Sequence, residues 1–487
     1  MRTAEEAAFA RGITAEALME QAGEGFARAV VRFFPRPGKC IVFAGKGHNA
    51  GDAFVAARWL AQWGWQIETR LVFGEKDLSP LTSKKLKELV ASAVSADKPS
   101  ALRTAHATTI VLDGLLGLGA HPPLREPIRG ACREINSLGE NGAGVVAIDL
   151  PSGLDGESGE ADAEAVRANF TISVGGAKSG LVADNAIDFV GRLEVVRLDE
   201  LRVHDLPGIE RGAETATGDS LRDLLPRRNY SAYKNQFGRI GIVAGSRGFT
   251  GAAIMSSLGA LRAGAGLVEL FVPEEIYEIL AGASAPEVMV KPVKSYADLL
   301  KEPIDVWAVG PGLGKSHAKE ILQLIRDATA PMVIDADGLN ILAEDMETLK
   351  QVHGPRLLTP HPGEMQRIFP HEKMSRAQVA NEFCAKYAVT LLLKGSRTIV
   401  AESGQPLSYN TTGNPGMATG GMGDVLTGVS AAILGAKLSP NDAARLGAWL
   451  SGRAAELAVS VGHASEESLL PSDVLNHLGA AFTDLRF

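Results

Sequence analysis

Short apolar segments that are typical of buried strands alternate with helical segments along most of the chain. Before residue 200 these segments cover residues 40–44, 67–73, 109–112, 145–148, 170–174 and 193–198. After residue 224 they cover residues 239–244, 267–272, 306–309, 332–334, 357–359, 390–393 and 398–401. Strands that alternate with helices form mostly parallel sheets with helices on both faces. The alternation therefore predicts an α/β protein built of three-layer domains.

Two such domains are expected, because 487 residues exceed what a single core usually holds. The polar segment 199–222 lacks a clear hydrophobic period and contains Pro207 and Gly212, which makes it the predicted linker. We expect the first domain at residues 1–210 and the second at residues 220–487.

Composition excludes several classes of function. The formal net charge of −8 argues against nucleic-acid binding, which needs a basic face. The 3 cysteines are scattered without CxxC spacing, so neither a zinc site nor a disulfide framework is indicated. No stretch approaches the roughly 20 apolar residues of a membrane span, and Glu5 and Glu6 argue against a secretory leader. The sequence predicts a cytoplasmic protein that acts on small molecules, with no nucleic-acid or membrane partner.

A glycine-rich run from Gly413 to Asp424 precedes a helix that is predicted to begin at Val425. Such a loop leaves the N–H groups of Gly421 to Gly423 free at a helix N-terminus, where an anion is stabilised. Asp424 could then take a proton from a hydroxyl that attacks a bound phosphoryl group. The alternative is that Asp424 only caps the helix. The run predicts a phosphate-handling catalytic centre.

Four further loops of this half follow strands or join them: 245–251, 310–314, 359–364 and 394–398. In open α/β sheets, ligands bind at the carboxyl ends of the strands. Each of these loops alone is a weak signal, but together with the Asp424 run they predict one converging site.

The combination of Thr359-Pro-His-Pro-Gly-Glu364, Lys394-Gly395 and the run 414–424 resembles the NAD(P)H-hydrate dehydratases, a carbohydrate-kinase-like branch of the ribokinase superfamily. The resemblance covers most of residues 220–487. It implies a ribokinase-like domain whose substrate is the damaged, C6-hydrated form of NADH or NADPH. It also implies a reaction in which ADP phosphorylates the hydroxyl and phosphate is then eliminated. Mg²⁺ is expected, because charge neutralisation dominates phosphoryl transfer.

The resemblance also implies binding residues. Those for the hydrated dinucleotide are Ala253, Gly312, His361 and Asp424, although Ala252 fits nearly as well as Ala253. Those for ADP are Lys394, Gly395, Ser396, Arg397, Thr398 and Gly423. The alternative function is a small-molecule hydroxyl kinase of the ribokinase superfamily with a non-catalytic N-terminal binding domain.

In the first domain, the loops 45–52, 113–119 and 149–155 each follow a predicted strand. With Gly12-Ile13 and Leu18-Met19-Glu20 they resemble the NAD(P)H-hydrate epimerase domain over about residues 1–200. The resemblance implies a Rossmann-like domain that interconverts the R and S epimers of the hydrate. It also implies a K⁺ ion with ligands Asn49, Asp113 and Ser152, whose oxygen atoms suit a hard cation.

Substrate-binding residues implied for this domain are His48, Asn49, Ala50, Gly51, Asp52, Gly117, Leu118, Gly119, Ala120, His121, Pro122, Pro123 and Asp149, with Asp149 as the proton carrier. The chain departs from the family pattern Asn-Asn-Gly-Gly-Asp-Gly at His48, Ala50 and Ala53. Each alanine adds a methyl group where the backbone is expected near the ligand. A degenerate, non-catalytic domain is the alternative. The complete enzyme is expected to be a homo-oligomer.

Overall fold

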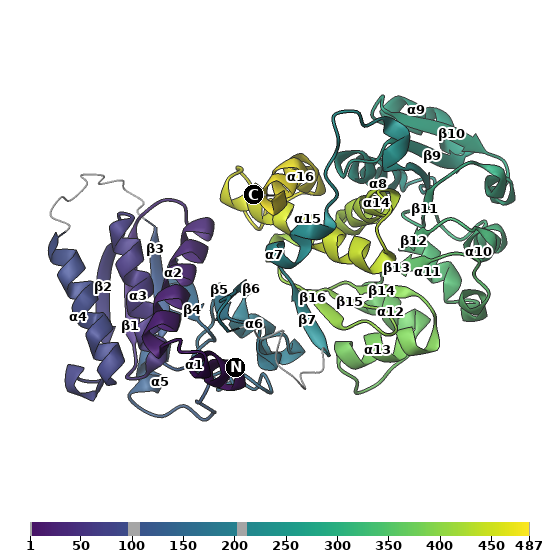
Figure 1. The fold of residues 1–487 in the computed structure, drawn as a ribbon. Coiled ribbons are helices and arrows are strands. Elements are labelled where there is room, and N and C mark those ends of the chain that lie inside the picture. Colours follow the sequence, from purple (N-terminus) through teal and green to yellow (C-terminus); the bar gives the residue numbers. More distant parts are fainter. Residues whose placement is uncertain (1, 96–107, 202–211, 487) are drawn as a thin grey trace. The chain divides into compact units, whose positions relative to one another are not determined.

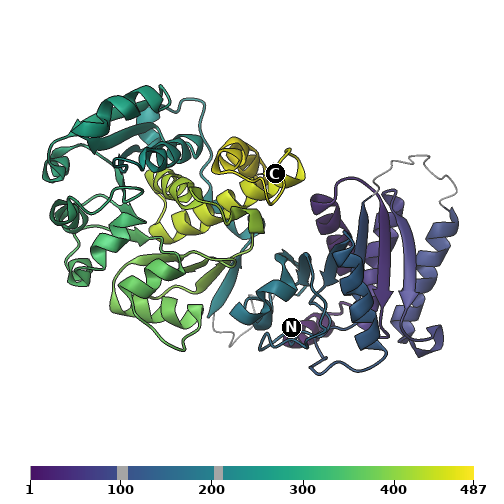
Figure 2. The same ribbon diagram turned by 180° about the vertical axis from the view of Figure 1, so that it is seen from behind.

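The computed structural model describes residues 2–95, 108–201 and 212–486. Contacts divide the chain into two compact units, Met1–Glu210 and Arg211–Phe487. Figure 1 shows both units with their elements labelled, and Figure 2 shows them from behind. Among the described residues, no helix combines the length and the apolarity that crossing a membrane requires.

The first unit contains one sheet of six strands in the order β2-β1-β3-β4-β5-β6, and every pair of neighbours is parallel. The strands are β1 (Lys39–Ala44), β2 (Gln66–Leu71), β3 (Thr109–Gly114), β4 (Gly144–Ile148), β5 (Phe170–Val174) and β6 (Arg192–Val196). The order reverses direction between β1 and β3, which is where open α/β sheets bind ligands.

Helices cover both faces of this sheet. They are α1 (Arg2–Ala10), α2 (Ala15–Phe33), α3 (His48–Gln62), α4 (Pro80–Ser95), α5 (Ile128–Glu140) and α6 (Ile187–Val190). Alternate residues of β1 point to opposite faces. Val42 and Ala44 pack in the cluster that contains α2, α3 and α4, whereas Ile41 and Phe43 pack in the cluster that contains α5. The unit therefore has the three layers that the sequence predicts.

The second unit contains one sheet of ten strands in the order β10-β9-β8-β11-β12-β13-β14-β15-β16-β7. The strands are β7 (Ala213–Ala216), β8 (Arg239–Val243), β9 (Leu267–Pro273), β10 (Val288–Val293), β11 (Val306–Val309), β12 (Met332–Ile334), β13 (Arg356–Leu358), β14 (Thr390–Leu393), β15 (Ile399–Ala401) and β16 (Leu407–Asn410). All pairs are parallel except those that β15 makes with β14 and β16. The direction of winding reverses between β8 and β11, so a ligand site is expected there.

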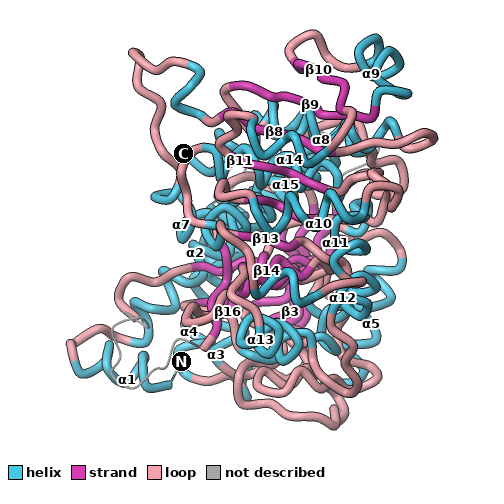
Figure 3. The backbone as a smooth tube through the Cα atoms, turned by 90° about the vertical axis from the view of Figure 1, so that its right-hand side faces the viewer, coloured by secondary structure: helices cyan, strands magenta, loops and turns pink. Residues whose placement is uncertain are grey.

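The helices of this unit are α7 (Gly218–Leu221), α8 (Thr250–Arg262), α9 (Tyr277–Ala283), α10 (Ala318–Asp327), α11 (Asp337–Leu342), α12 (Pro362–Ile368), α13 (Arg376–Lys386), α14 (Met422–Gly435), α15 (Pro440–Ser460) and α16 (Pro471–Arg486). α8, α14, α15 and α16 share one core cluster with the sheet. In Figure 3, α8 and α14 run beside β8, β9 and β11. α10 to α13 lie on the other side of the sheet (Figures 1 and 2).

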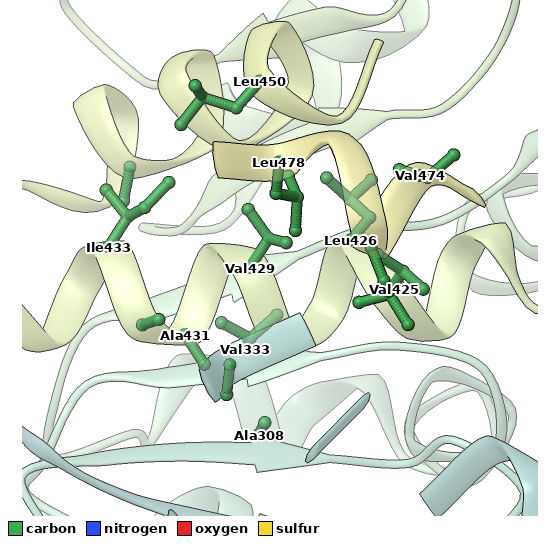
Figure 4. Close-up of a cluster of buried hydrophobic side chains, with 14 of the residues drawn as sticks. Ala308, Val333, Val425, Leu426, Val429, Ala431, Ile433, Leu450, Val474 and Leu478 are labelled. Atoms are coloured by element: carbon green, nitrogen blue, oxygen red, sulfur yellow. The ribbon is translucent and has the colours of Figure 1, made fainter. Parts of the chain in front are cut away.

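α14 is the central helix of this core. Figure 4 shows it between side chains of the sheet, Ala308 and Val333, and side chains of the last two helices, Leu450 and Leu478. A helix that is apolar all round is buried on all sides, and every residue of α14 from Val425 onward is buried. This packing fixes the position of the N-terminus of α14.

The linker prediction is wrong for the described residues that follow the gap. Ala213–Ala216 forms β7, which adds to the sheet of the second unit by parallel pairing with β16. Thr217 then caps α7, and Leu221 is fully buried. Residues 202–211 of the predicted linker lie outside the described residues. β10 and β16 were not predicted, and α14 begins at Met422, one turn before the predicted start at Val425.

Candidate active sites of the two units

The loops after β8 and β11 meet at the reversal point of the second sheet. The N–H of Gly245 donates to the carbonyl of Pro311 at 2.9 Å, and Ser246 Oγ donates to the carbonyl of Gly312 at 2.8 Å. Gly312 has a φ of 59°, and a Cβ there would lie 2.9 Å from the Cβ of Phe249. Only glycine fits this crossing, and the sequence prediction that these two loops converge is confirmed.

A cavity of about 350 Å³ opens beside these loops. Three segments line it, namely the start of α8, the start of α14 and the start of α16: Gly251, Ala252, Met255, Gly420, Gly421, Asp424, Leu470, Pro471 and Ser472. A cavity of this size falls within the range of small-molecule sites. The predicted residue Ala253 is fully buried in the core, and its neighbour Ala252 lines the cavity instead.

The N-terminus of α14 forms one wall of this cavity. Gly421 is the N-cap with a φ of 96°, a conformation that favours glycine. The N–H of Met422 makes a long bond of 3.4 Å to the carbonyl of Thr419, and within the described chain the N–H groups of Gly421 and Gly423 donate to no protein acceptor. These N–H groups remain available for an anion.

Asp424 lies in the first turn of α14 and lines the cavity. Gly421 is the cap and no side chain caps this helix, so the alternative of Asp424 as an N-cap is wrong. Burial raises the pKa of Asp424 to about 6; the charge of Asp335 adds to the rise, and Lys394 opposes it. A carboxyl group with such a pKa can accept a proton near neutral pH.

Lys394 lies next to Asp424 and pairs with Asp335, a residue that the sequence analysis missed. Lys394 Nζ donates to Asp335 Oδ1 at 2.7 Å, and Thr427 Oγ1 donates to Asp335 Oδ2 at 2.7 Å. Burial disfavours the ammonium ion, but Asp335 and Glu364 outweigh it and raise the pKa of Lys394. Asp335 directly follows the buried strand β12, and this placement was the signal that could have identified it.

His361 caps α12. Its Nδ1 accepts from the N–H groups of Gly363 and Glu364 at 3.0 and 3.3 Å, and its side chain is 51% exposed. Glu364 Oε2 accepts in return from the N–H of His361 at 2.8 Å and lies 3.8 Å from Lys394 Nζ. The Thr359–Glu364 motif therefore sets a carboxylate beside the lysine and leaves an imidazole edge exposed.

The other residues expected to bind ADP are placed differently from one another. Gly395 and Ser396 are exposed, Thr398 is half-buried, and the side chain of Arg397 is buried. A Cβ at Gly423 would lie 3.3 Å from Lys394 Nζ and 3.5 Å from Asp335 Oδ2. Gly423 thus brings the amides of α14 close to the lysine.

In the first unit, the loops after β1 and β3 meet at the reversal point of the sheet. Asn49 Nδ2 donates to the carbonyl of Leu116 at 2.7 Å, and a Cβ at Gly117 would lie 3.4 Å from the Cβ of Asn49. The predicted segment from His48 to Asp52 forms the first turn of α3. Although His48 and Asn49 are adjacent in sequence, the side chain of His48 is exposed and that of Asn49 is buried.

The residues predicted to hold K⁺ lie together. Ser152 Oγ donates to Asp113 Oδ1 at 2.7 Å and accepts from the N–H of Leu116 at 3.0 Å. The carbonyl of the same Leu116 accepts from Asn49 Nδ2. Asp113 is fully buried, and no described lysine or arginine forms an ion pair with it. Burial raises the pKa of Asp113 to about 6 despite its bonds from Ser152 and Leu115. A buried carboxylate without a cation suits an alkali ion.

Asp149 follows β4 and pairs with Lys178, a residue that the sequence analysis did not single out. The φ of Asp149 is 68°, in the left-handed region. Asp52, in the first turn of α3, interacts with this pair. Burial is the main cause that raises the pKa of Asp52 well above the usual range, and the charges of Asp149 and Glu5 add to the rise, whereas Lys178 opposes it. Two carboxyl groups and one ammonium ion therefore share this end of the sheet.

The predicted substrate loop 117–123 follows β3. Leu118, Gly119 and His121 are exposed, whereas Gly117, Ala120 and Pro122 are half-buried, and Pro123 is exposed. His121 Nδ1 lies 2.5 Å from Asp155 Oδ2, which links this loop to the loop after β4. Bonds from Ser158 and His121 lower the pKa of Asp155.

No group of three or more His, Cys, Asp and Glu side chains within the described ranges could hold a metal ion. A doubly wound unit that combines free N–H groups at a helix N-terminus with a lysine and a half-buried acid is suited to phosphoryl transfer. Here such a unit is joined to a second α/β unit in which an aspartate pairs with a lysine.

Comparisons with known proteins identify the family. The family model for NAD(P)H-hydrate dehydratase matches residues 240–476, and the model for the YjeF-related protein N-terminus matches residues 15–180. The bifunctional NAD(P)H-hydrate repair enzyme of Gloeobacter violaceus is 37% identical over 481 residues, covering 93% of each chain. That of Escherichia coli is 35% identical and covers 93% of this chain and 87% of its own. The chain belongs to the family of bifunctional NAD(P)H-hydrate repair enzymes, as its resemblance predicts.

Solved structures include an ADP/ATP-dependent NAD(P)H-hydrate dehydratase from Bacillus subtilis that was co-crystallized with ATP/Mg²⁺. It is 28% identical to this chain with a TM-score of 0.49, and the match covers 56% of this chain and 98% of that chain.

Proposed function

We propose that the chain repairs hydrated NADH and NADPH in two reactions. The first unit interconverts the R and S epimers, and the second unit dehydrates the S epimer with ADP, releasing AMP and phosphate. The observation that carries the proposal is the half-buried Asp424, with a pKa of about 6, in a cavity wall beside unpaired helix amides and Lys394.

In the second unit, Asp424 takes the proton of the C6 hydroxyl, and the hydroxyl oxygen attacks the terminal phosphoryl group of ADP. The N–H groups of Gly421 and Gly423 and the ammonium ion of Lys394 stabilise the charge on the transferring group. Hydroxide is a poor leaving group, whereas phosphate is a good one. Once the ester has formed, the C6–O bond breaks to release phosphate, and loss of a proton from C5 restores the dihydronicotinamide.

Magnesium would bind here through few protein atoms. Mg²⁺ typically uses one or two carboxylates together with phosphate oxygens. Glu364 fits this role, because its carboxylate lies beside Lys394: Oε2 is 3.8 Å from Lys394 Nζ, and Oε1 is 3.5 Å from His361 Nε2. When bound, the ion neutralises charge on the nucleotide phosphates.

The altered loop of the first unit remains compatible with epimerase activity. The methyl groups of Ala50 and Ala53 are fully buried in the core, and Ala53 packs against Gly114, where an added Cβ would lie 2.6 Å away. These methyl groups therefore point into the unit and not toward a ligand. Asn49, Asp113 and Ser152 would hold K⁺, which supplies positive charge for the dinucleotide phosphates.

The test combines the purified chain with S-hydrated NADH, Mg²⁺ and either ADP or ATP. Recovery of the near-ultraviolet absorbance of NADH, with one AMP per NADH when ADP is used, supports the proposal. A stable phosphorylated product without recovered NADH would instead support a small-molecule hydroxyl kinase. Incubation with the R epimer in K⁺ and in Na⁺ tests the first unit, and conversion no faster than the spontaneous rate would indicate a non-catalytic binding domain.

A further inference from the structure

Asp149 occupies a backbone conformation that aspartate rarely adopts. Its φ of 68° lies in the left-handed region, which costs a residue with a Cβ about 1–2 kcal/mol. Glycine would relieve that cost. The presence of an aspartate at this position therefore points to a role for its carboxylate.

The ammonium group of Lys178 is saturated with acceptors. It donates to Asp149 Oδ1, to Ser173 Oγ at 3.0 Å and to the carbonyl of Val174 at 3.2 Å. An ammonium ion has three donors, so none remains for a ligand. The lysine side chain is 7% exposed. Lys178 can therefore hold a neighbouring group but cannot itself give a proton to a substrate without breaking this set.

All the hydrogen bonds to the carboxylate of Asp149 reach the same oxygen. Lys178, the N–H of Val174 at 3.1 Å and Ser173 Oγ at 3.4 Å all donate to Oδ1. No described residue donates to Oδ2, and 15% of the side chain is exposed. One oxygen is thus anchored to the end of β5, and the other is left for a ligand.

We propose that Lys178 is a positioning residue of the epimerase: it locks Asp149 through Oδ1 so that Oδ2 exchanges the proton of the C6 hydroxyl. This proposal rests on the proposed epimerase function of the first unit. Lys178 acts through Asp149 and does not touch the substrate.

The reaction that this arrangement serves neither gains nor loses a proton. The C6 hydroxyl leaves as water after it receives a proton from a carboxyl group, and the lone pair of the ring nitrogen forms a C=N bond. Water then adds to the opposite face of C6, which returns the electron pair to nitrogen and a proton to a carboxylate. Asp52 from α3 interacts with both Asp149 and Lys178, and Glu5 from α1 interacts with Asp52. No oxidant or second substrate is needed.

The test uses the full chain, because dehydration of the S epimer by the second unit reports on enzyme concentration. Lys178→Met should lower kcat for R-to-S conversion about 100-fold, the low end of a general acid–base contribution, with KM nearly unchanged. Lys178→Arg should restore part of the rate.

Asp149→Asn and the double variant with Lys178→Met complete a cycle. If the lysine acts through Asp149, the double variant is no slower than Asp149→Asn alone. The inference is overturned if Lys178→Met keeps the wild-type kcat, or if its loss of rate adds fully to that of Asp149→Asn. It is also overturned if both lysine variants merely unfold the first unit, as seen in its thermal transition. Absence of R-to-S conversion in the wild type would instead reject the proposed function itself.

Discussion

The two units use the same pair of residues, a lysine beside an aspartate at the carboxyl end of a parallel sheet, in opposite ways. In the first unit, the ammonium group of Lys178 uses all three of its N–H donors in hydrogen bonds to Asp149, Ser173 and Val174. In the second unit, the Nζ of Lys394 makes one hydrogen bond among the described residues, to Asp335, and its side chain is 19% exposed. The saturated lysine can orient the carboxylate beside it, whereas the unsaturated lysine keeps donors for an anion such as a phosphoryl group. This contrast agrees with the reactions proposed for the two units.

The largest effect that would test this contrast comes from Asp424→Asn. Removal of a general base costs about 10²–10⁴ in rate, so dehydration of the S epimer should fall by about that factor while ADP still binds. The variant should not be less stable, because it removes a charge that burial disfavours. Stopped assays of NADH formation, with nucleotide titration and R-to-S conversion as controls, measure this. Near-normal dehydration would show that another group is the base.

Lys394→Met should lower kcat for dehydration about 100-fold, which is the typical cost of losing one charged donor to a transition state. Lys394→Arg should retain more activity, because it keeps the positive charge. Epimerisation in the same chain should be unchanged. Equal losses in both reactions would mean that the substitution disrupts more than the second site.

The rate of dehydration should follow the protonation state of Asp424. Because burial raises the pKa of Asp424 to about 6, dehydration should fall tenfold per unit of pH below about 6. The same shift means that the folded unit binds this proton more tightly than the unfolded chain does. The contribution of Asp424 to the stability of the second unit, measured as the difference between wild type and Asp424→Asn, therefore decreases as pH rises from about 4 through 6. Rates and thermal transitions measured across this range check both signs, and an acid limb near pH 4 would contradict the assignment.

The smallest expected effect belongs to Thr427→Val, which removes the hydroxyl that donates to Asp335 Oδ2. A buried acceptor left without its donor costs about 1–3 kcal/mol, so the thermal transition of the second unit should fall and dehydration should slow several-fold. Thr427→Ser keeps the hydroxyl and serves as the matched control. If both variants behave alike, the hydroxyl does not support the Asp335–Lys394 pair.

Motifs close in sequence were predictable, whereas partners distant in sequence were not. Glycine-rich loops after strands indicated Gly312 and Asp424, because strand ends and helix starts are local features. Asp335 pairs with Lys394 and Thr427, which lie 59 and 92 residues away, and only the folded sheet brings them together. The short strand β7 was hidden in a polar segment, since its pairing with β16 depends on an edge formed much later in the chain.

Lys178 was overlooked for the same reason, because it lies 29 residues from Asp149 and no motif marks it. The sequence also could not show where the methyl groups of Ala50 and Ala53 point. The sequence suggested that Ala50 and Ala53 would crowd a ligand, but both face the core. Family resemblance indicated the loops, and the packing shows which of their side chains lie in the core.

One measurement tests most directly that the two units perform separate reactions. An equal mixture of R- and S-hydrated NADH is incubated with ADP, Mg²⁺ and K⁺, and NADH formation is followed together with the remaining epimers. The wild type should convert both epimers, Asp149→Asn should stop near half conversion except for spontaneous epimerisation, and Asp424→Asn should form NADH only at its strongly reduced rate while still interconverting the epimers. If Asp149→Asn completes the reaction at the wild-type rate, or if Asp424→Asn forms NADH at a near-normal rate, this division of labour is contradicted.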